Sequence, residues 1–206
     1  MKKINNKNGY TIIETMIAIS VFLVVVMIGM GALLNADLIN QKSGDMRSIL
    51  DNISFVMDDM STSLRTGTNY YCINSGTAGT SLGSIVATSG QNCWGIAFKS
   101  AGPNSQEWGY EIVSQTSAGV TTYSIIRSED GGATWVTLTP PEVVVTGNVA
   151  GVQISGFSVL GAEPLSAGNK QQPFVTIRLV GTITYKNVVS PFSFQTSVSQ
   201  RDIDIQ

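Results

Sequence analysis

An uncharged, mostly apolar run from Thr15 to Ala36 is the dominant hydrophobic pattern of the chain. Its 22 residues rise about 33 Å as a helix, which is enough to cross the hydrocarbon core of a membrane. The run shows no polar face, whereas a buried helix of a soluble protein seldom continues for this length without one. The pattern therefore favours a membrane-spanning helix, which we place at residues 10–36.

Residues 37–67 show the periodicity of an amphipathic helix. Apolar side chains recur at steps of three and four positions, and charged ones such as Asp51 and Asp58 fall mostly on other faces. The apolar stripe consists of Met46, Ile49, Leu50, Ile53, Val56, Met57, Met60 and Leu64. We expect it to pack on a sheet of the same chain, with a partner-binding face as the alternative, and Gly67 to cap the helix. The periodicity leaves open whether the helix is continuous through residues 40–44.

Residues 68–206 form a β-rich region. After Cys93, short runs of β-branched and aromatic residues are separated by Gly, Ser, Asn and Pro. The predicted strands are Trp94–Lys99, Trp108–Val113, Val120–Arg127, Thr134–Leu138, Val143–Val145, Val152–Leu160, Phe174–Tyr185 and Phe192–Ile205. Residues 74–81 have the composition of a flexible connector, and residues 161–173 that of an exposed loop. A membrane segment followed by one exported domain is the simplest organisation for 206 residues.

The charges around the apolar run indicate its orientation. Lys2, Lys3 and Lys7 precede it, and the next basic residue is Lys42. Positively charged flanks stay in the cytoplasm. We therefore expect a single-pass protein of the inner, cytoplasmic membrane, with a cytoplasmic N-terminus and an exported C-terminal domain.

Two features distinguish the start of this run from an ordinary secretory signal. A secretory signal has a shorter apolar region and a small-residue cleavage site on its far side, whereas here Gly9 precedes the apolar run. Glu14 places a carboxylate just inside the apolar span, which is costly unless it has a partner. If the chain is cut after Gly9, the new amino group of Tyr10 lies one helical turn from Glu14, and the amine of a neighbouring subunit serves equally well.

The stretch from Gly9 to Glu14, Gly-Tyr-Thr-Ile-Ile-Glu, resembles the prepilin leader and cleavage motif of type IV pilins and type II secretion pseudopilins. The usual motif reads Gly-Phe-Thr-Leu-Ile-Glu, and the likeness extends over roughly residues 2–36. It implies that a prepilin peptidase cuts between Gly9 and Tyr10, that Tyr10 is then N-methylated, and that Glu14 pairs with a neighbour's N-terminus during assembly. Two departures are Tyr10, where phenylalanine is commoner, and Gly31, near the place of a helix-loosening proline in many major pilins.

The resemblance implies an α+β, pilin-like fold, in which a long N-terminal helix packs through its second half on a C-terminal antiparallel β-sheet domain. The expected segments are a leader at 1–9, a transmembrane and assembly helix at 10–36, an amphipathic helix at 37–67 and an exported domain at 68–206. The implied partners are other pilin or pseudopilin subunits, the prepilin peptidase and an inner-membrane assembly platform. After assembly, the subunit is expected in an extracellular or periplasmic filament.

Cys72 and Cys93 are the only cysteines and flank the uncharged connector. Because export is already indicated, we expect a disulfide between them, with two unpaired thiols as the alternative. Two cysteines in a chain without histidine make a poor ligand set for a metal.

Composition narrows the chemistry further. The formal net charge is −2, and it becomes −5 once the three leader lysines are removed, with no basic patch to suggest a nucleic-acid partner. The absence of histidine excludes the common Ser-His and Cys-His nucleophile arrangements. Asp202 and Asp204 share one face of a predicted strand, but two carboxylates fall short of the ligands that calcium requires. We expect no enzyme activity, no cofactor and no metal.

Residues 128–135, Ser-Glu-Asp-Gly-Gly-Ala-Thr-Trp, match the Asp-box pattern Ser-x-Asp-x-Gly-x-Thr-Trp. The glycines allow the positive φ of a tight turn, and Asp130 is placed to accept hydrogen bonds from nearby amides. In sialidases and related propellers the motif repeats and is structural. We interpret this single copy as a turn.

Three functions fit the sequence to different degrees. The first is a minor pilin or pseudopilin, a filament subunit of a type IV pilus-like or type II secretion system that polymerises through its N-terminal helix. The alternative is an adhesin-like module on a pilin stalk that recognises a surface or glycan through loops near Cys72–Cys93 or Asp130, which an aromatic-lined concavity would favour. An exported hydrolase held by a signal anchor would need a convergent pair of carboxylates.

Overall fold

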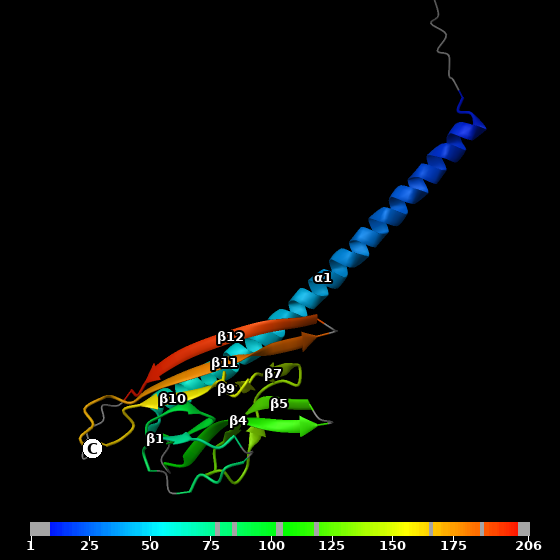
Figure 1. The fold of residues 1–206 in the computed structure, drawn as a ribbon. Helices are drawn as coiled ribbons and strands as arrows, with labels where there is room; N and C mark the ends of the chain where they lie inside the picture. The colour runs from blue at the N-terminus through cyan, green and yellow to red at the C-terminus, as the bar shows by residue number, and fades with distance from the viewer. Residues whose placement is uncertain are drawn as a thin grey trace, which may run out of the picture. The chain divides into compact units, whose positions relative to one another are not determined.

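The computed structural model describes residues 9–76, 79–83, 86–101, 105–117, 120–164, 167–185 and 188–201. The chain divides into two compact units, Met1–Asp45 and Met46–Gln206. Helix α1 (Ile12–Thr66) contributes to both, and residues 40–44 are helical (Figure 1).

The strands of the second unit follow α1 in the chain (Figure 1). Their bounds are β1 Thr68–Ile73, β2 Gly90–Cys93, β3 Gly95–Lys99, β4 Glu107–Ser117, β5 Val120–Ser128, β6 Val136–Thr137, β7 Val143–Val145, β8 Asn148–Val149, β9 Val152–Gln153, β10 Gly156–Leu160, β11 Phe174–Tyr185 and β12 Val188–Ser199. In the described residues, ten of them form one sheet along the order β1-β3-β4-β5-β7-β11-β10-β2, with β12 on β11 and β6 on β5. All strand pairs are antiparallel, so the predicted α+β fold with a helix on an antiparallel sheet is confirmed.

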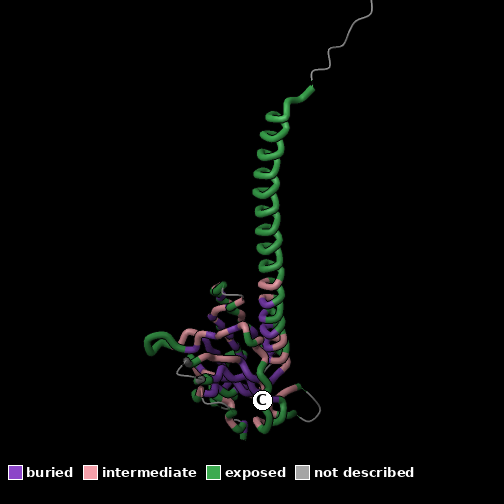
Figure 2. The backbone as a smooth tube through the Cα atoms, turned by 90° about the vertical axis from the view of Figure 1, so that its right-hand side faces the viewer, coloured by how far each residue is buried: buried purple, intermediate pink, exposed green. Residues whose placement is uncertain are grey.

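The predicted apolar stripe of α1 is the face that packs on this sheet. Six of its members are buried, and Met46 and Leu50 are partly buried (Figure 2). The six are Ile49, Ile53, Val56, Met57, Met60 and Leu64. They join one core with side chains of the sheet, among them Phe98 and Tyr110. The steps of three and four residues thus predicted the buried face correctly, because positions at these steps share one side of a helix.

The end of α1 is set by close packing around Gly67. The helix ends at Thr66, and the Gly67 amide still donates to the Ser63 carbonyl at 3.0 Å. Gly67 does not have the positive φ of a left-handed cap; instead, a Cβ at this position would clash with the ring of Phe98. The Tyr70 hydroxyl, 2.6 Å from the carbonyl oxygens of Leu64 and Gly67, supplies a donor to the helix end.

Several strands differ from those expected. Strands β1 and β2 were not predicted, because the sequence around them resembles an uncharged connector. The predicted strand at 152–160 is two strands, β9 and β10, separated at Ile154 and Ser155. There the Ser155 hydroxyl, in place of a backbone group, donates to the Val180 carbonyl and accepts from the Val180 amide. The last strand begins at Val188 rather than at Phe192 and ends at Ser199, and residues 202–206, with Asp202 and Asp204, lie outside the described residues.

The outer edge of β12 pairs with no strand that the structure describes. Gln200 donates to the Pro173 carbonyl, so even-numbered residues of β12 bond toward β11 and odd-numbered ones point their backbone groups outward. Pro191 is one of the outward positions, where its missing N–H costs no ladder bond. Toward the C-terminal end of β12, residues 196–201 form one wall of a hollow of about 520 Å³. Its other wall includes Ser61, Thr62 and Arg65 of α1.

A polar link joins α1 to the middle of the sheet. Asp59 Oδ2 accepts from Arg127 at 2.9 Å and from the Tyr110 hydroxyl at 3.2 Å, and Arg127 also pairs with Glu129. Tyr110 is fully buried, and burial raises its pKa to about 12. The link orients the helix on an otherwise apolar interface.

Replacing Asp59 by alanine is therefore expected to lower the free energy of unfolding by about 1–2 kcal/mol, since Arg127 and the Tyr110 hydroxyl lose a charged acceptor that is partly exposed to solvent. Urea unfolding followed by tryptophan fluorescence measures the change. Asp58→Ala, one position away on the exposed side, is the matched control and should change stability by less than about 0.5 kcal/mol. Equal losses in the two variants would contradict this role for Asp59.

Candidate functional site: the N-terminal segment

The start of the described chain is open to solvent. Gly9 and Tyr10 precede α1, and the Tyr10 side chain is 81% exposed. Apart from its chain neighbours, no atom of the described residues lies within 4 Å of a Cβ built on Gly9. The peptide bond between these two residues is therefore sterically accessible, as a cleavage site must be.

Thr11 caps the first turn of α1. Its hydroxyl accepts from the Glu14 amide at 3.3 Å, and its carbonyl accepts from the amides of Glu14 and Thr15. Thr11 is therefore the Ncap residue and Glu14 the N3 residue, with the Ser/Thr-x-x-Glu spacing of a capping box and the first of its two bonds, from the Glu14 amide to the Thr11 hydroxyl. The sequence analysis did not assign this role to Thr11, although the spacing from Thr11 to Glu14 is the signal that finds it.

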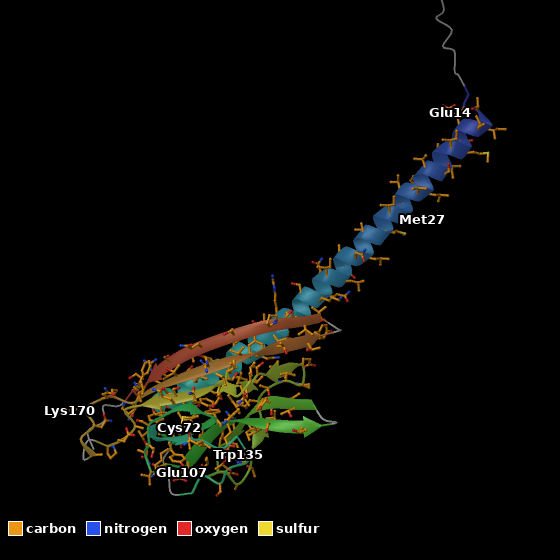
Figure 3. All side chains as sticks on the ribbon, in the orientation of Figure 1. Glu14, Met27, Cys72, Glu107, Trp135 and Lys170 are labelled. Atoms are coloured by element: carbon orange, nitrogen blue, oxygen red, sulfur yellow. A yellow bond between two sulfur atoms is a disulfide. The ribbon has the colours of Figure 1, made fainter. Side chains whose placement is uncertain are left out.

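Glu14 lies in the first turn of α1 (Figure 3). A carboxylate is favourable there, because the unpaired N–H groups at the start of a helix carry partial positive charge. Its side-chain oxygens accept no hydrogen bond from any residue that the structure describes. The carboxylate is thus held at a defined place in the helix and is available to a partner outside the chain.

The first unit exposes apolar side chains on all sides of α1. They project outward around the whole helix, and Met27 is one of them (Figure 3). The most exposed include Ile12, Ile13, Met16, Met27, Ile28, Leu33 and Leu34. α1 is long and apolar enough to cross a membrane. Because water disfavours such a surface, this part of the helix requires lipid or other helices around it.

Residues 4–30 match the family model of the prokaryotic N-terminal methylation motif. The methylation motif thus spans Gly9, Tyr10, Glu14 and most of the apolar run, as far as Met30. It supports the type IV pilin-like family that the sequence resembles and, with the apolar helix, membrane anchoring with an exported domain. No curated protein and no solved structure matches the chain.

Cys72 and Cys93 form a disulfide in the second unit, with their Cα atoms 5.5 Å apart. Both are buried, at the end of β1 and of β2 respectively. The bond closes the segment between those strands, and it stands in place of the two free thiols that were the alternative. The segment between β1 and β2 is partly packed, because Leu82, which directly follows the predicted connector, is buried with Ile73 and Ala97.

The Asp-box sequence forms a tight turn, as its residues predict. Asp130 accepts from the amide and hydroxyl of Thr134 and from the Ser128 hydroxyl, and these bonds lower its pKa to about 2. Gly131 and Gly132 both have positive φ. The Trp135 indole donates to the Gly132 carbonyl and packs against the cluster around Leu82. All of these contacts are internal, so the motif has a structural role here.

The sequence also raised a glycan-binding surface lined by aromatic side chains and a metal site. An aromatic hollow of about 320 Å³ is lined by Gly76, Trp94, Ser114 and Tyr123. Trp94 and Tyr123 stack on each other, and the close approach of Gly76 to Trp94 and of Gly147 to Tyr123 uses these rings in packing. Within the described ranges, no group of three potential metal-ligating side chains occurs.

Proposed function

We propose that this protein is a structural subunit of a type IV pilus-like or type II secretion filament, and within that class a minor pilin or pseudopilin. The observation that carries the proposal is the methylation motif at residues 4–30, which leads directly into a helix with apolar side chains on every side. Such a helix needs an apolar environment both before and after assembly. A membrane supplies it first, and a bundle of identical or related helices supplies it afterwards.

Processing in this proposal follows from the chemistry of the first residues. Prepilin peptidase cuts between Gly9 and Tyr10, and the new amino group on Tyr10 is methylated. Glu14, fixed in the first turn by the Thr11 cap, then pairs with the N-terminus of a neighbouring subunit. A carboxylate and an amine that meet in a low-dielectric helix bundle neutralise each other, which lowers the cost of placing either charge there.

The same proposal assigns the parts of the chain. Residues 1–9 are the leader, residues 10–36 the transmembrane and assembly helix, residues 37–67 the amphipathic helix, and residues 68–206 the exported domain. The protein begins as a single-pass inner-membrane protein with a cytoplasmic N-terminus. Its partners are other pilin or pseudopilin subunits, the peptidase and the assembly platform, and its role is structural rather than enzymatic.

Mass spectrometry of the mature N-terminus, on protein from host membranes, tests the proposal. We expect a chain that begins at N-methylated Tyr10. The same host without its prepilin peptidase is the control and should yield a chain that begins at Met1. A mature protein that begins at Met1 in the normal host, or that is cut after Ala36, would contradict the proposal.

A further inference from the structure

Glu111 is a buried carboxyl group that has no role in the proposed filament assembly. It lies on β4, and its exposed fraction is 0%. Neither of its side-chain oxygens accepts a hydrogen bond from any residue that the structure describes. An ionised carboxylate in such a place is strongly disfavoured unless something compensates it.

A glycine on the neighbouring strand makes room for the Glu111 side chain. Gly95 of β3 is its partner in register, and a Cβ built there would lie 2.7 Å from Glu111 Cγ and 3.2 Å from Ile73 Cδ1. The side chain therefore lies across β3 toward β1, on an apolar face. Ala97 and Ile73, both buried, belong to the cluster on this face.

Residues 79–83, which we name the cover segment, close this face from outside. Leu82 is buried, and its amide donates to the Gly131 carbonyl at 3.0 Å. A Cβ on Gly132 would lie 2.7 Å from the Leu82 nitrogen, so only glycine lets the Asp-box turn approach this closely. A Cβ on Gly109 would lie 2.7 Å from Leu82 Cδ1, so a second glycine makes room for the leucine. Among the described residues, one backbone hydrogen bond and the packing of the Leu82 side chain hold the cover segment.

The donors nearest to Glu111 are on the cover segment. Burial raises the pKa of Glu111, and the Thr80 hydroxyl with the Thr80 and Gly79 amides opposes this rise without reaching hydrogen-bond geometry. Strand alternation places three other titratable groups on the same face of the sheet as Glu111. They are Tyr71 of β1, Lys99 of β3 and Glu107 of β4. None of them contributes to the shift. The residues of β5 nearest to Glu111 on this face, Ser124, Ile126 and Ser128, do not titrate.

We propose that the cover segment is a pH-dependent lid, closed over a protonated Glu111 and released when this carboxyl ionises. Release breaks the Leu82–Gly131 bond and removes the Leu82 side chain from its cluster with Ile73 and Ala97. The Cys72–Cys93 disulfide meanwhile holds the ends of β1 and β2 together. An open lid hydrates the carboxylate and exposes the apolar surface formed by Ile73, Leu82 and Ala97. The exported domain then presents different surfaces in acidic and in alkaline surroundings.

The direction of the pH effect follows from the raised pKa. Below the ordinary glutamate pKa of 4.5, the carboxyl is protonated in both the closed and the open state, so closure is fully favoured. Between that value and the raised pKa, opening releases a proton, and the opening constant rises by about tenfold per pH unit. Above the raised pKa, both states are ionised and the opening constant levels off.

Hydrogen exchange in the cover segment tests the lid. Full-length protein in detergent micelles is exchanged over a range of pH, and protection of peptides containing Leu82 is calculated after correction for the intrinsic rate. We expect protection in the wild type to fall by about tenfold per pH unit above pH 4.5, and protection in Glu111→Gln to stay constant. Glu107→Gln, on the same strand and face, is the matched control and should behave as the wild type does.

A pH-independent wild type would overturn the proposal, as would a Glu111→Gln variant that keeps the wild-type decline. Should Glu111→Gln fail to fold, Thr80→Val provides an independent test. It removes a hydroxyl that opposes the burial effect, so the decline should extend to higher pH. A decline that ends at the wild-type pH in Thr80→Val would count against the lid.

Discussion

Replacing both Cys72 and Cys93 by alanine is expected to lower the free energy of unfolding of the exported domain by about 3–5 kcal/mol. The bond spans a sequence separation of 21 residues, and the loop-entropy relation assigns about 3 kcal/mol to a loop of this size. The remainder reflects packing, because Cys93 is completely buried and Cys72 nearly so, and loss of their sulfur atoms leaves unfilled volume.

Urea unfolding of the full-length protein in detergent, followed by tryptophan fluorescence, measures this loss. Ser89→Ala is a suitable control inside the same closed segment. It removes the bond that the Ser89 hydroxyl donates to Glu163 and the one that it accepts from the Ala162 amide, without opening the loop. It should lower stability by about 1–2 kcal/mol. A double-cysteine variant that loses less than this control would show that the bond contributes little to the domain.

Replacing Glu14 by alanine is expected to reduce incorporation into filaments by roughly 100-fold or more, while membrane insertion and removal of the leader continue. This expectation rests on the proposed function. Removing one partner of a buried charge pair costs about 3–5 kcal/mol, and each 1.4 kcal/mol is a factor of ten in an equilibrium. In Glu14→Ala, the N-terminal amine of the neighbouring subunit would be left unpaired in an apolar helix bundle.

Quantitative immunoblots of sheared filaments against whole cells measure the effect of Glu14→Ala. Thr15→Ala is the matched control, because the Thr15 hydroxyl bonds only within its own helix, to the Ile12 carbonyl, at 2.8 Å. Glu14→Asp, which keeps the charge, should retain part of the incorporation. Normal incorporation of Glu14→Ala would remove Glu14 from the assembly role.

Local patterns in the sequence predicted much of the fold. The stripe from Met46 to Leu64 could be found because helical periodicity determines which residues share a face. Strand β11 was predicted with its observed bounds, since its alternation is regular and Pro173 directly precedes its first residue. The turn at Asp130 followed from residue types whose conformations are nearly independent of the rest of the chain.

Features that depend on distant partners could not be predicted. The two strands that the disulfide joins, β1 and β2, carry weak patterns and gain order from pairing with β3 and β10. The environment of Glu111 depends on Gly95, its partner on β3, and on Leu82, which lies between β1 and β2. Neither residue is close to Glu111 in the sequence. Gly67 was expected for its backbone freedom, whereas its actual constraint is the ring of Phe98.

The proline in β12 bears on how these domains behave at high local concentration. An extended chain that adds to a sheet needs a donor at every second position of the exposed edge, and position 191 offers none. Beyond it, residues 196–201 form one wall of a hollow of about 520 Å³, whose other wall includes Ser61, Thr62 and Arg65 of α1. If filament assembly brings these domains close together, as we propose, Pro191 disfavours a sheet shared between neighbouring copies through the β12 edge.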